Sequence, residues 1–192
     1  MRIIGGRFKR RRMAEPPDAG VRPTSDRLRE TLFNILGPAV ESARVVDGFA
    51  GTGALGLEAL SRGAAYVVFV EPGERARQVL RENVRRCGVG SACAVLEEEF
   101  LAACADAGSE ARKAAADLVL LDPPYDYPDI QEALAAAGVL LGDGGRVVLE
   151  HSRRRESPGG VEVLRRSRVL VAGDSALSFY DRDAEGGNRS MP

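Results

Sequence analysis

The sequence has no tryptophan, one histidine and three cysteines, and these scarcities exclude several classes of protein. The cysteines form no C-x-x-C pair and lie near no histidine cluster, so we expect reduced thiols and no metal site. No stretch without a charged residue exceeds 10 residues, whereas a membrane-spanning helix needs about 20 apolar residues. The basic first twelve residues are followed by no apolar segment, unlike a secretory signal. We therefore expect a cytoplasmic protein with no membrane partner.

The chain has the length and composition of one folded domain. It contains 192 residues, of which 44% are hydrophobic and 29% charged. Those values are ordinary for a globular protein and exclude a wholly disordered chain. We expect a monomer.

Charge is distributed unevenly, although the formal net charge is only −1. Residues 1–37 contain nine basic and four acidic side chains, so the remaining residues sum to −6. The basic residues are nearly all arginine, which pairs with phosphate through two parallel hydrogen bonds. We predict that residues 1–37 form a basic arm and helix that bind a polyanion; a solvated tail is the alternative. The candidate phosphate contacts are Arg7, Arg10, Arg11, Arg12 and Arg22.

From residue 44 onward, the hydrophobic pattern alternates between strands and helices. Before this alternation, apolar residues at helical spacing predict a helix that Thr24, Ser25 or Asp26 can cap and that Gly37–Pro38 ends. Residues 161–172 and 176–182 predict a hairpin. The pattern predicts an α/β domain at 38–182, with a Rossmann-like, mostly parallel sheet, helices on both faces and an antiparallel C-terminal hairpin. Residues 183–192 are expected to form a flexible tail. The expected strands are 44–47, 65–71, 92–96, 117–122 and 145–151, and the expected helices are 54–62, 73–87, 98–107 and 130–137.

A glycine-rich segment follows the first predicted strand. It reads DGFAGTGALG from Asp47 and leads directly into a helix, whose first N–H groups are unpaired. Glycines allow a sharp turn and a close approach of a ligand, and Asp47 suits a cationic group or hydroxyls. The segment also fits the G-x-G-x-x-G dinucleotide pattern, with Glu71 20 residues on. It therefore predicts a nucleoside cofactor without separating a nicotinamide cofactor from S-adenosylmethionine. Its candidate cofactor contacts are Asp47, Phe49, Gly51 and Gly53.

Acidic residues follow the second and third predicted strands. Glu71 ends the second strand, where its carboxylate could accept both hydroxyls of a ribose. Three consecutive glutamates, residues 97–99, follow the third strand and could accept from an adenine amino group. Because adjacent side chains point in different directions, we select Glu99 for this contact.

The fourth strand ends in Asp122-Pro123-Pro124-Tyr125. The prolines fix φ and remove two N–H donors, which leaves an extended turn with carbonyl acceptors. An Asp oxygen and a proline carbonyl can both accept from a planar exocyclic amine, and the tyrosine offers a face for stacking a base. A hydride-transfer enzyme has no need of this turn. The turn therefore favours S-adenosylmethionine as the cofactor and a nucleobase amine as the methyl acceptor.

These motifs resemble those of S-adenosylmethionine-dependent methyltransferases that act on exocyclic amines of nucleobases. The resemblance is closer still to the bacterial RsmD family of 16S rRNA (guanine-N2) methyltransferases, and it extends from residue 1 to about residue 182. It is carried by MRIIGG at the N-terminus, RPTSDRLRETLFN from Arg22, residues 47–64, and DPPY at 122–125. The resemblance implies a seven-stranded sheet, the cofactor over the first three strand ends, and the target guanine at residues 122–125. It also implies 16S rRNA, within a small-subunit particle, as the partner.

Two positions depart from that family's pattern. Gly48 stands where a leucine is usual and should loosen the turn while sparing cofactor binding. Residues 172–175 read AGDS in place of Tyr-Gly-x-Thr, which removes an aromatic residue but keeps a hydroxyl at Ser175. The single histidine, His151, is assigned no role in the site.

The predicted reaction is methyl transfer to an unstacked guanine in RNA. Asp122 and the Pro123 carbonyl accept from the amine and aim its lone pair at the methyl group, so orientation and electrostatics supply most of the rate enhancement. The base must leave its stack, which favours a loop or a flipped nucleotide. Three alternatives remain: an adenine-N6 methyltransferase, a nicotinamide-dependent oxidoreductase, and a non-catalytic RNA-binding assembly factor.

Overall fold

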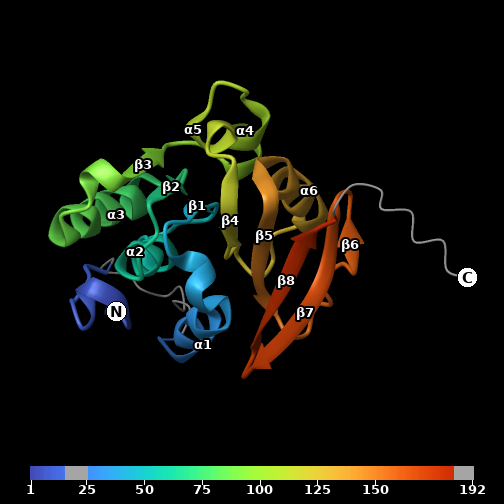
Figure 1. Cartoon of the computed structure of the whole chain (residues 1–192), viewed down its shortest axis with the longest axis horizontal. Helices are drawn as coiled ribbons and strands as arrows, with labels where there is room; N and C mark the ends of the chain where they lie inside the picture. Colours follow the sequence, from blue (N-terminus) through green and yellow to red (C-terminus); the bar gives the residue numbers. More distant parts are fainter. Residues whose placement is uncertain (16–25, 184–192) are drawn as a thin grey trace, which may run out of the picture.

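The computed structural model describes residues 1–15 and 26–183. Within them, eight strands form one sheet in the order β3-β2-β1-β4-β5-β8-β7-β6 (Figure 1). The strands are β1 (Arg44–Asp47), β2 (Tyr66–Val70), β3 (Cys93–Leu96), β4 (Ala116–Leu121), β5 (Leu141–Ser152), β6 (Gly160–Val161), β7 (Leu164–Ala172) and β8 (Ser175–Arg182). The helices are α1 (Asp26–Leu36), α2 (Ala54–Ser61), α3 (Glu74–Cys87), α4 (Phe100–Ala105), α5 (Glu110–Lys113) and α6 (Ile130–Leu140), with short 3-10 turns at Gly6–Phe8, Gly37–Val40 and Gly90–Ala92.

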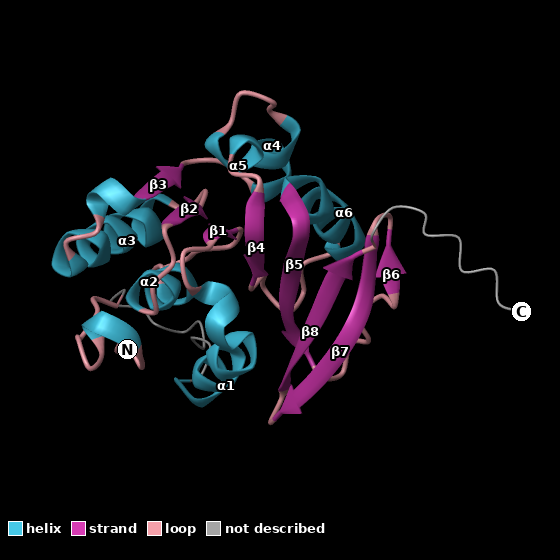
Figure 2. Ribbon diagram, in the orientation of Figure 1, coloured by secondary structure: helices cyan, strands magenta, loops and turns pink. Residues whose placement is uncertain are grey.

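The first five strands are parallel, and β8, β7 and β6 continue the sheet in antiparallel pairing. Strand order reverses direction between β1 and β4, because the chain runs outward from β1 to β3 and then returns to the other side. Apart from the exposed Arg44 and Asp117, the residues of β1 and β4 are buried and most of them are Val or Leu, as expected where helices cover both faces of a parallel sheet. Figure 2 shows the helices on either side of these strands. The switch between β1 and β4 is where such sheets bind ligands.

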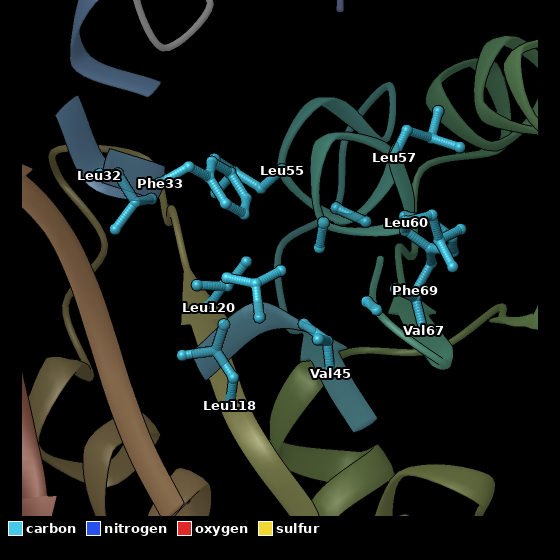
Figure 3. Close-up of a cluster of buried hydrophobic side chains, with 14 of the residues drawn as sticks. Leu32, Phe33, Val45, Leu55, Leu57, Leu60, Val67, Phe69, Leu118 and Leu120 are labelled. Atoms are coloured by element: carbon cyan, nitrogen blue, oxygen red, sulfur yellow. The ribbon is translucent and has the colours of Figure 1, made fainter. Parts of the chain in front are cut away.

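Two hydrophobic clusters occupy the two faces of the sheet. Side chains of α1, α2 and α3 pack on one face, and those of α4, α5 and α6 pack on the other. Successive strand residues alternate between them: Val45 belongs to the first cluster and Val46 to the second. In Figure 3, Phe33 and Leu55 lie opposite Val45 and Leu120 in the first cluster.

The N-terminal residues are folded onto α2 and α3. The side chain of Ile3 is only 1% exposed and belongs to the first hydrophobic cluster. The carboxylate of Glu58 accepts hydrogen bonds from the amides of Ile4 and Gly5, both at 2.8 Å. Ala14 donates to Asn83 Oδ1 at 2.7 Å. Residues 1–15 are thus anchored by backbone bonds to buried side chains.

The predicted fold class is confirmed, with local corrections. The sheet has eight strands where seven were expected, because residues 160 and 161 form a separate short strand and the chain turns back at Glu162, which has a φ of 50°. Helix α5 was not predicted; Ser109 caps it by accepting from the amides of Ala111 and Arg112. Arg22 and residues 184–192 of the predicted tail lie outside the described residues. None of the helices in the described ranges combines the length and hydrophobicity needed to cross a membrane.

Candidate active site

A cleft of about 610 Å³ opens at the carboxyl ends of the parallel strands. Segments that follow four different strands contribute to it, together with a residue of β5. This is the position predicted for the ligand from the order of strands and helices. The lining consists of Phe49, Gly51, Glu71, Pro72, Glu99, Asp122, Pro123, Pro124, Tyr125, Tyr127 and Glu150.

The turn after β1 is held in shape by two glycines and one glutamate. Gly51 and Gly53 have positive φ angles of 53° and 86°, which side chains rarely adopt. A Cβ on Gly53 would also lie 2.4 Å from Leu80 Cδ1, so this glycine allows α2 and α3 to pack closely. Gly51 donates its amide hydrogen to Glu71 Oε2 at 2.8 Å. Gly51 therefore lines the cleft, whereas Gly53 lies outside the lining and packs closely against Leu80 of α3.

Asp47 is enclosed within this turn. Its side chain is 1% exposed, and Oδ2 accepts from the amide of Gly56 at 2.9 Å. Its other oxygen, Oδ1, is buried and has no hydrogen-bond partner among the described residues. Burial raises the pKa of Asp47 to about 7, and the nearby charges of Asp122 and Glu71 add to the increase. Asp47 is not part of the cleft lining, but its carboxylate interacts electrostatically with those of Asp122 and Glu71, which are.

Glu71 and Glu99 both line the cleft, as the sequence predicted. Glu71 is held by a second backbone bond, from the amide of Gly73 to Oε1 at 2.7 Å. Among the three consecutive glutamates, Glu97 is instead ion-paired with Arg81 and Arg77. These pairs hold the pKa of Glu97 below its usual value. Of the three consecutive glutamates, Glu99 is thus the one that lines the cleft, and its contact with a cofactor stays a prediction.

The Asp122–Tyr125 turn lines the cleft together with Glu71. Pro123 is buried, Asp122 is half-buried, and Pro124 and Tyr125 are exposed. The turn is closed by the amide of Tyr127, which donates to the Pro124 carbonyl at 2.9 Å. All four residues of the turn line the same cleft as Gly51 and Glu71. The two strongest motifs of the sequence therefore meet in one space.

Three lining residues were not selected from the sequence: Pro72, Tyr127 and Glu150. The Tyr127 ring packs edge-on against Phe49, with 5.0 Å between ring centroids, and Phe49 contacts Phe100 at 5.5 Å. Glu150 lies near the end of β5, whereas only the ends of the first four strands were considered. Extending the strand-end rule to β5 would have identified Glu150.

The charge of the lining restricts the ligand. Four carboxylates, those of Glu71, Glu99, Asp122 and Glu150, line the cleft, and its described lining contains no basic side chain. Such a site favours a cationic ligand and disfavours the pyrophosphate of a dinucleotide. Within the described ranges, no group of three His, Cys, Asp or Glu side chains is placed to hold a metal ion.

The predicted phosphate-binding residues lie outside this cleft. Arg7, Arg10, Arg11 and Arg12 are all exposed. The guanidinium groups of Arg7 and Arg11 lie 4.6 and 5.1 Å from the centroid of the Phe8 ring. Arg11 also donates to the carbonyl of Arg86 at 2.5 Å. The basic segment is therefore a separate, ordered surface.

Comparison with known proteins agrees with this geometry. Residues 1–181 match the family described as Conserved hypothetical protein 95. The chain belongs to this family. It is 35% identical over 188 residues to "Ribosomal RNA small subunit methyltransferase D" of Escherichia coli strain K12, covering 97% of this chain and 92% of that protein. This relationship confirms the resemblance to the RsmD family.

Solved structures resemble the Conserved hypothetical protein 95 chain over most of its length. The structure of "Putative methyltransferase yhhF" from Escherichia coli superposes with a TM-score of 0.83 at 34% identity, covering 96% of this chain and 99% of that one. An RNA methyltransferase from Salinibacter ruber in complex with S-adenosyl-L-homocysteine has a TM-score of 0.64 at 16% identity, covering 89% of this chain and 100% of that one. The second similarity shows the fold alone.

The structure shows the surroundings of the two positions that depart from the family's pattern, Gly48 and the segment 172–175. A Cβ on Gly48 would lie 2.7 Å from Phe100 Cδ2 and 2.8 Å from Leu121 Cδ2, so these side chains fill the space. Gly48 is not among the glycines with a positive φ, so its backbone conformation does not itself require glycine, and the looser turn stays a prediction. The Ser175 hydroxyl is hydrogen-bonded to the Tyr125 hydroxyl, with 2.6 Å between the two oxygens.

Proposed function

We propose that this protein transfers a methyl group from S-adenosylmethionine to the exocyclic N2 amine of a guanine in 16S rRNA of the small ribosomal subunit. The observation that carries this proposal is the shared cleft, which is lined both by the hydrogen-bonded pair Gly51 and Glu71 and by the Asp122–Tyr125 turn. A cofactor site and an amine-binding turn in one space are what a group transfer requires.

The residues around the cleft fit S-adenosylmethionine. Glu71 would accept hydrogen bonds from the ribose hydroxyls and Glu99 from the adenine amino group, and Phe49 would pack against an apolar part of the cofactor; all three residues line the cleft. The negative charges of Glu71 and Asp122 favour a sulfonium cation, as does Asp47, whose buried Oδ1 lacks a hydrogen-bond partner among the described residues. When bound, the cofactor supplies an electrophilic methyl group.

Asp122 and Pro123 act on the methyl acceptor. The two N–H groups of the guanine amine would donate hydrogen bonds to an Asp122 oxygen and to the Pro123 carbonyl, which orients the nitrogen lone pair. Tyr125, 45% exposed, offers a ring on which the base stacks. Tyr127 and Phe49 form an apolar wall that limits the access of water. Once the nitrogen has four substituents, its surplus proton leaves to solvent, so Asp122 need not be a strong base.

The exposed basic residues of the N-terminal segment supply the affinity for RNA. The carboxylates of the cleft repel phosphates, so backbone binding must occur elsewhere on the protein. The N-terminal segment is held in place by hydrogen bonds from its backbone to the carboxylate of Glu58. Its exposed basic residues include Arg7, Arg10, Arg11 and Arg12. Phosphate contacts there would position the RNA without reading its sequence.

Two binding and transfer measurements test this function. Calorimetry should detect S-adenosylhomocysteine binding, with NADH binding weaker or absent. With S-adenosylmethionine carrying a labelled methyl group, label should enter 16S rRNA, supplied either naked or within small subunits. Tighter binding of NADH than of S-adenosylhomocysteine, or no label in either RNA, would overturn the proposal.

A further inference from the structure

Glu150 is a nearly buried carboxylate beside the amine-binding turn. It lies in β5, its side chain is 5% exposed, and it lines the cleft together with Asp122 and Tyr125. The register explains its place: Leu121 of β4 pairs with Leu149 of β5, and the next residues of the two chains are Asp122 and Glu150. Neighbouring strands lie about 4.8 Å apart. Two carboxylates therefore stand side by side at one wall of the cleft.

The alternation of the strand directs Glu150 toward one face of the sheet. Leu149 belongs to the cluster packed under α4 and α6, whereas Val148 and Leu177 belong to the opposite cluster. Glu150 pairs with Leu177 of β8 and so shares that opposite face at the cleft.

The edge of guanine that carries the N2 amine has a second donor. Guanine presents N1–H next to its amine, whereas adenine has an acceptor at N1. An acceptor-only side chain beside the amine site would bond guanine N1–H and repel the N1 lone pair of adenine. A site built to bond a group of the substrate strongly rejects an analogue that lacks it.

We propose that Glu150 is a specificity-determining residue that accepts the N1–H of the target guanine while Asp122 and Pro123 hold its N2 amine. This inference rests on the proposed function, since it assigns the reading of the base within the same site. Glu150 would give the selection for guanine that the Asp122–Tyr125 turn cannot give alone, because that turn fits any exocyclic amine.

The test compares guanine with 2-aminopurine at the methylated position of an rRNA fragment, assembled into small subunits if the naked fragment is not a substrate. 2-Aminopurine keeps the N2 amine but has an acceptor at N1 and lacks O6. Wild-type protein should prefer guanine in kcat/KM. The Glu150→Gln variant should lower this preference roughly 10- to 100-fold, because it replaces a charged hydrogen bond and its amide can donate to N1. The missing O6 affects both proteins equally and cancels in the comparison.

A matched control removes another glutamate near the site. Glu156→Gln changes an 89% exposed side chain outside the cleft lining and should leave the guanine preference unchanged. Thermal unfolding and S-adenosylhomocysteine affinity of Glu150→Gln separate a loss of structure from a loss of specificity. If both substrates slow equally in that variant, the proposal is wrong.

The wild-type protein alone also tests the inference. Equal rates on guanine and 2-aminopurine would overturn it even if Glu150→Gln fails to fold. If the wild-type protein methylates no guanine at all, the proposed function fails as well. Guanine methylation with an unaltered preference in Glu150→Gln would reject only the role of Glu150.

Discussion

The Tyr125 hydroxyl and the Ser175 hydroxyl are hydrogen-bonded, with 2.6 Å between their oxygens. This bond joins the turn after β4 to the start of β8, 50 residues later in the chain. It fixes the outer edge of the tyrosine ring, while the inner face of the turn lines the cleft. The ring is therefore held in place before any base arrives, which reduces the ordering required on binding.

Substitutions at Tyr125 should separate stacking from positioning. Tyr125→Ala removes the ring and should lower kcat/KM for RNA about 10- to 100-fold, since stacking on an aromatic side chain contributes roughly 1–3 kcal/mol. Tyr125→Phe keeps the ring and loses one hydrogen bond, so a loss of a few-fold is expected. Steady-state methylation assays give both values, with Ser175→Ala as the matched control for the bond. Equal losses in the Ala and Phe variants would contradict a stacking role.

The pKa of Asp47 predicts a pH dependence of stability. This pKa is raised from 3.8 to about 7 in the folded protein, so the folded state binds the proton more tightly than the unfolded state. The stabilising effect of the protonated group is complete below pH 3.8 and is lost as pH rises toward 7. Asp47→Asn should remove this loss while keeping an acceptor for the Gly56 amide.

Urea unfolding of wild-type and Asp47→Asn proteins tests this prediction. The stability of the variant relative to wild type should increase by up to about 1.4 kcal/mol per pH unit between pH 5 and 7, then level off. Other titrating groups are common to both proteins and cancel in the difference. Parallel stability curves would show that Asp47 is ionised throughout this range.

Glu58 should be a major anchor of the N-terminal segment. Its buried carboxylate accepts from Ile4, Gly5 and Arg62, and Arg29 Nε lies 3.9 Å away. Glu58→Ala would leave these donors without their acceptor, and we expect the free energy of unfolding to fall by about 3–5 kcal/mol. Glu74→Ala, at an exposed helix start, should have little effect in the same urea titration. A fall below about 1 kcal/mol for Glu58→Ala would contradict the anchoring role.

Charge reversal should reveal whether the basic segment binds RNA phosphates. The triple variant Lys9→Glu, Arg10→Glu, Arg12→Glu avoids Arg11, which bonds the carbonyl of Arg86. Losing three phosphate contacts should flatten the plot of log affinity against log salt by about two units. Cofactor affinity should not change.

A matched triple variant controls for net charge in that experiment. Arg44→Glu, Arg112→Glu and Lys113→Glu change charge to the same extent near α5 and the start of β1. RNA affinity measured over a range of salt concentrations should keep its slope in this control. An unchanged slope in the N-terminal triple variant, with folding intact, would show that its side chains form only a solvated surface.

The sequence predicts the central sheet well because its strands are unusually apolar. β4 and β1 are buried on both faces, and the segments between strands show helical spacing with glycine or proline at their ends. Short elements without such patterns escape prediction. Helix α5 has one turn and depends on the Ser109 cap, and β6 has two residues and depends on the backward turn at Glu162.

The site is predictable where local sequence dictates backbone shape. Glycines at 51 and 53 and prolines at 123 and 124 limit their own conformations, so they indicate turns without reference to the rest of the fold. Tyr127 reaches the cleft by packing against Phe49, which no local pattern encodes, whereas Glu150 lies near the end of β5, where the rule used for the other strand ends also applies. The burial of Asp47 is also a tertiary effect, because it arises from the packing of the whole βα turn.

Identification of the methylated nucleoside tests the central claim most directly. Small subunits incubated with the protein and S-adenosylmethionine are digested to nucleosides and analysed by mass spectrometry. We predict N2-methylguanosine with the wild-type protein, and none with Asp122→Ala, whose affinity for S-adenosylhomocysteine should stay within a few-fold of wild type. The appearance of N6-methyladenosine in its place, or undiminished N2-methylguanosine with Asp122→Ala, would contradict the account.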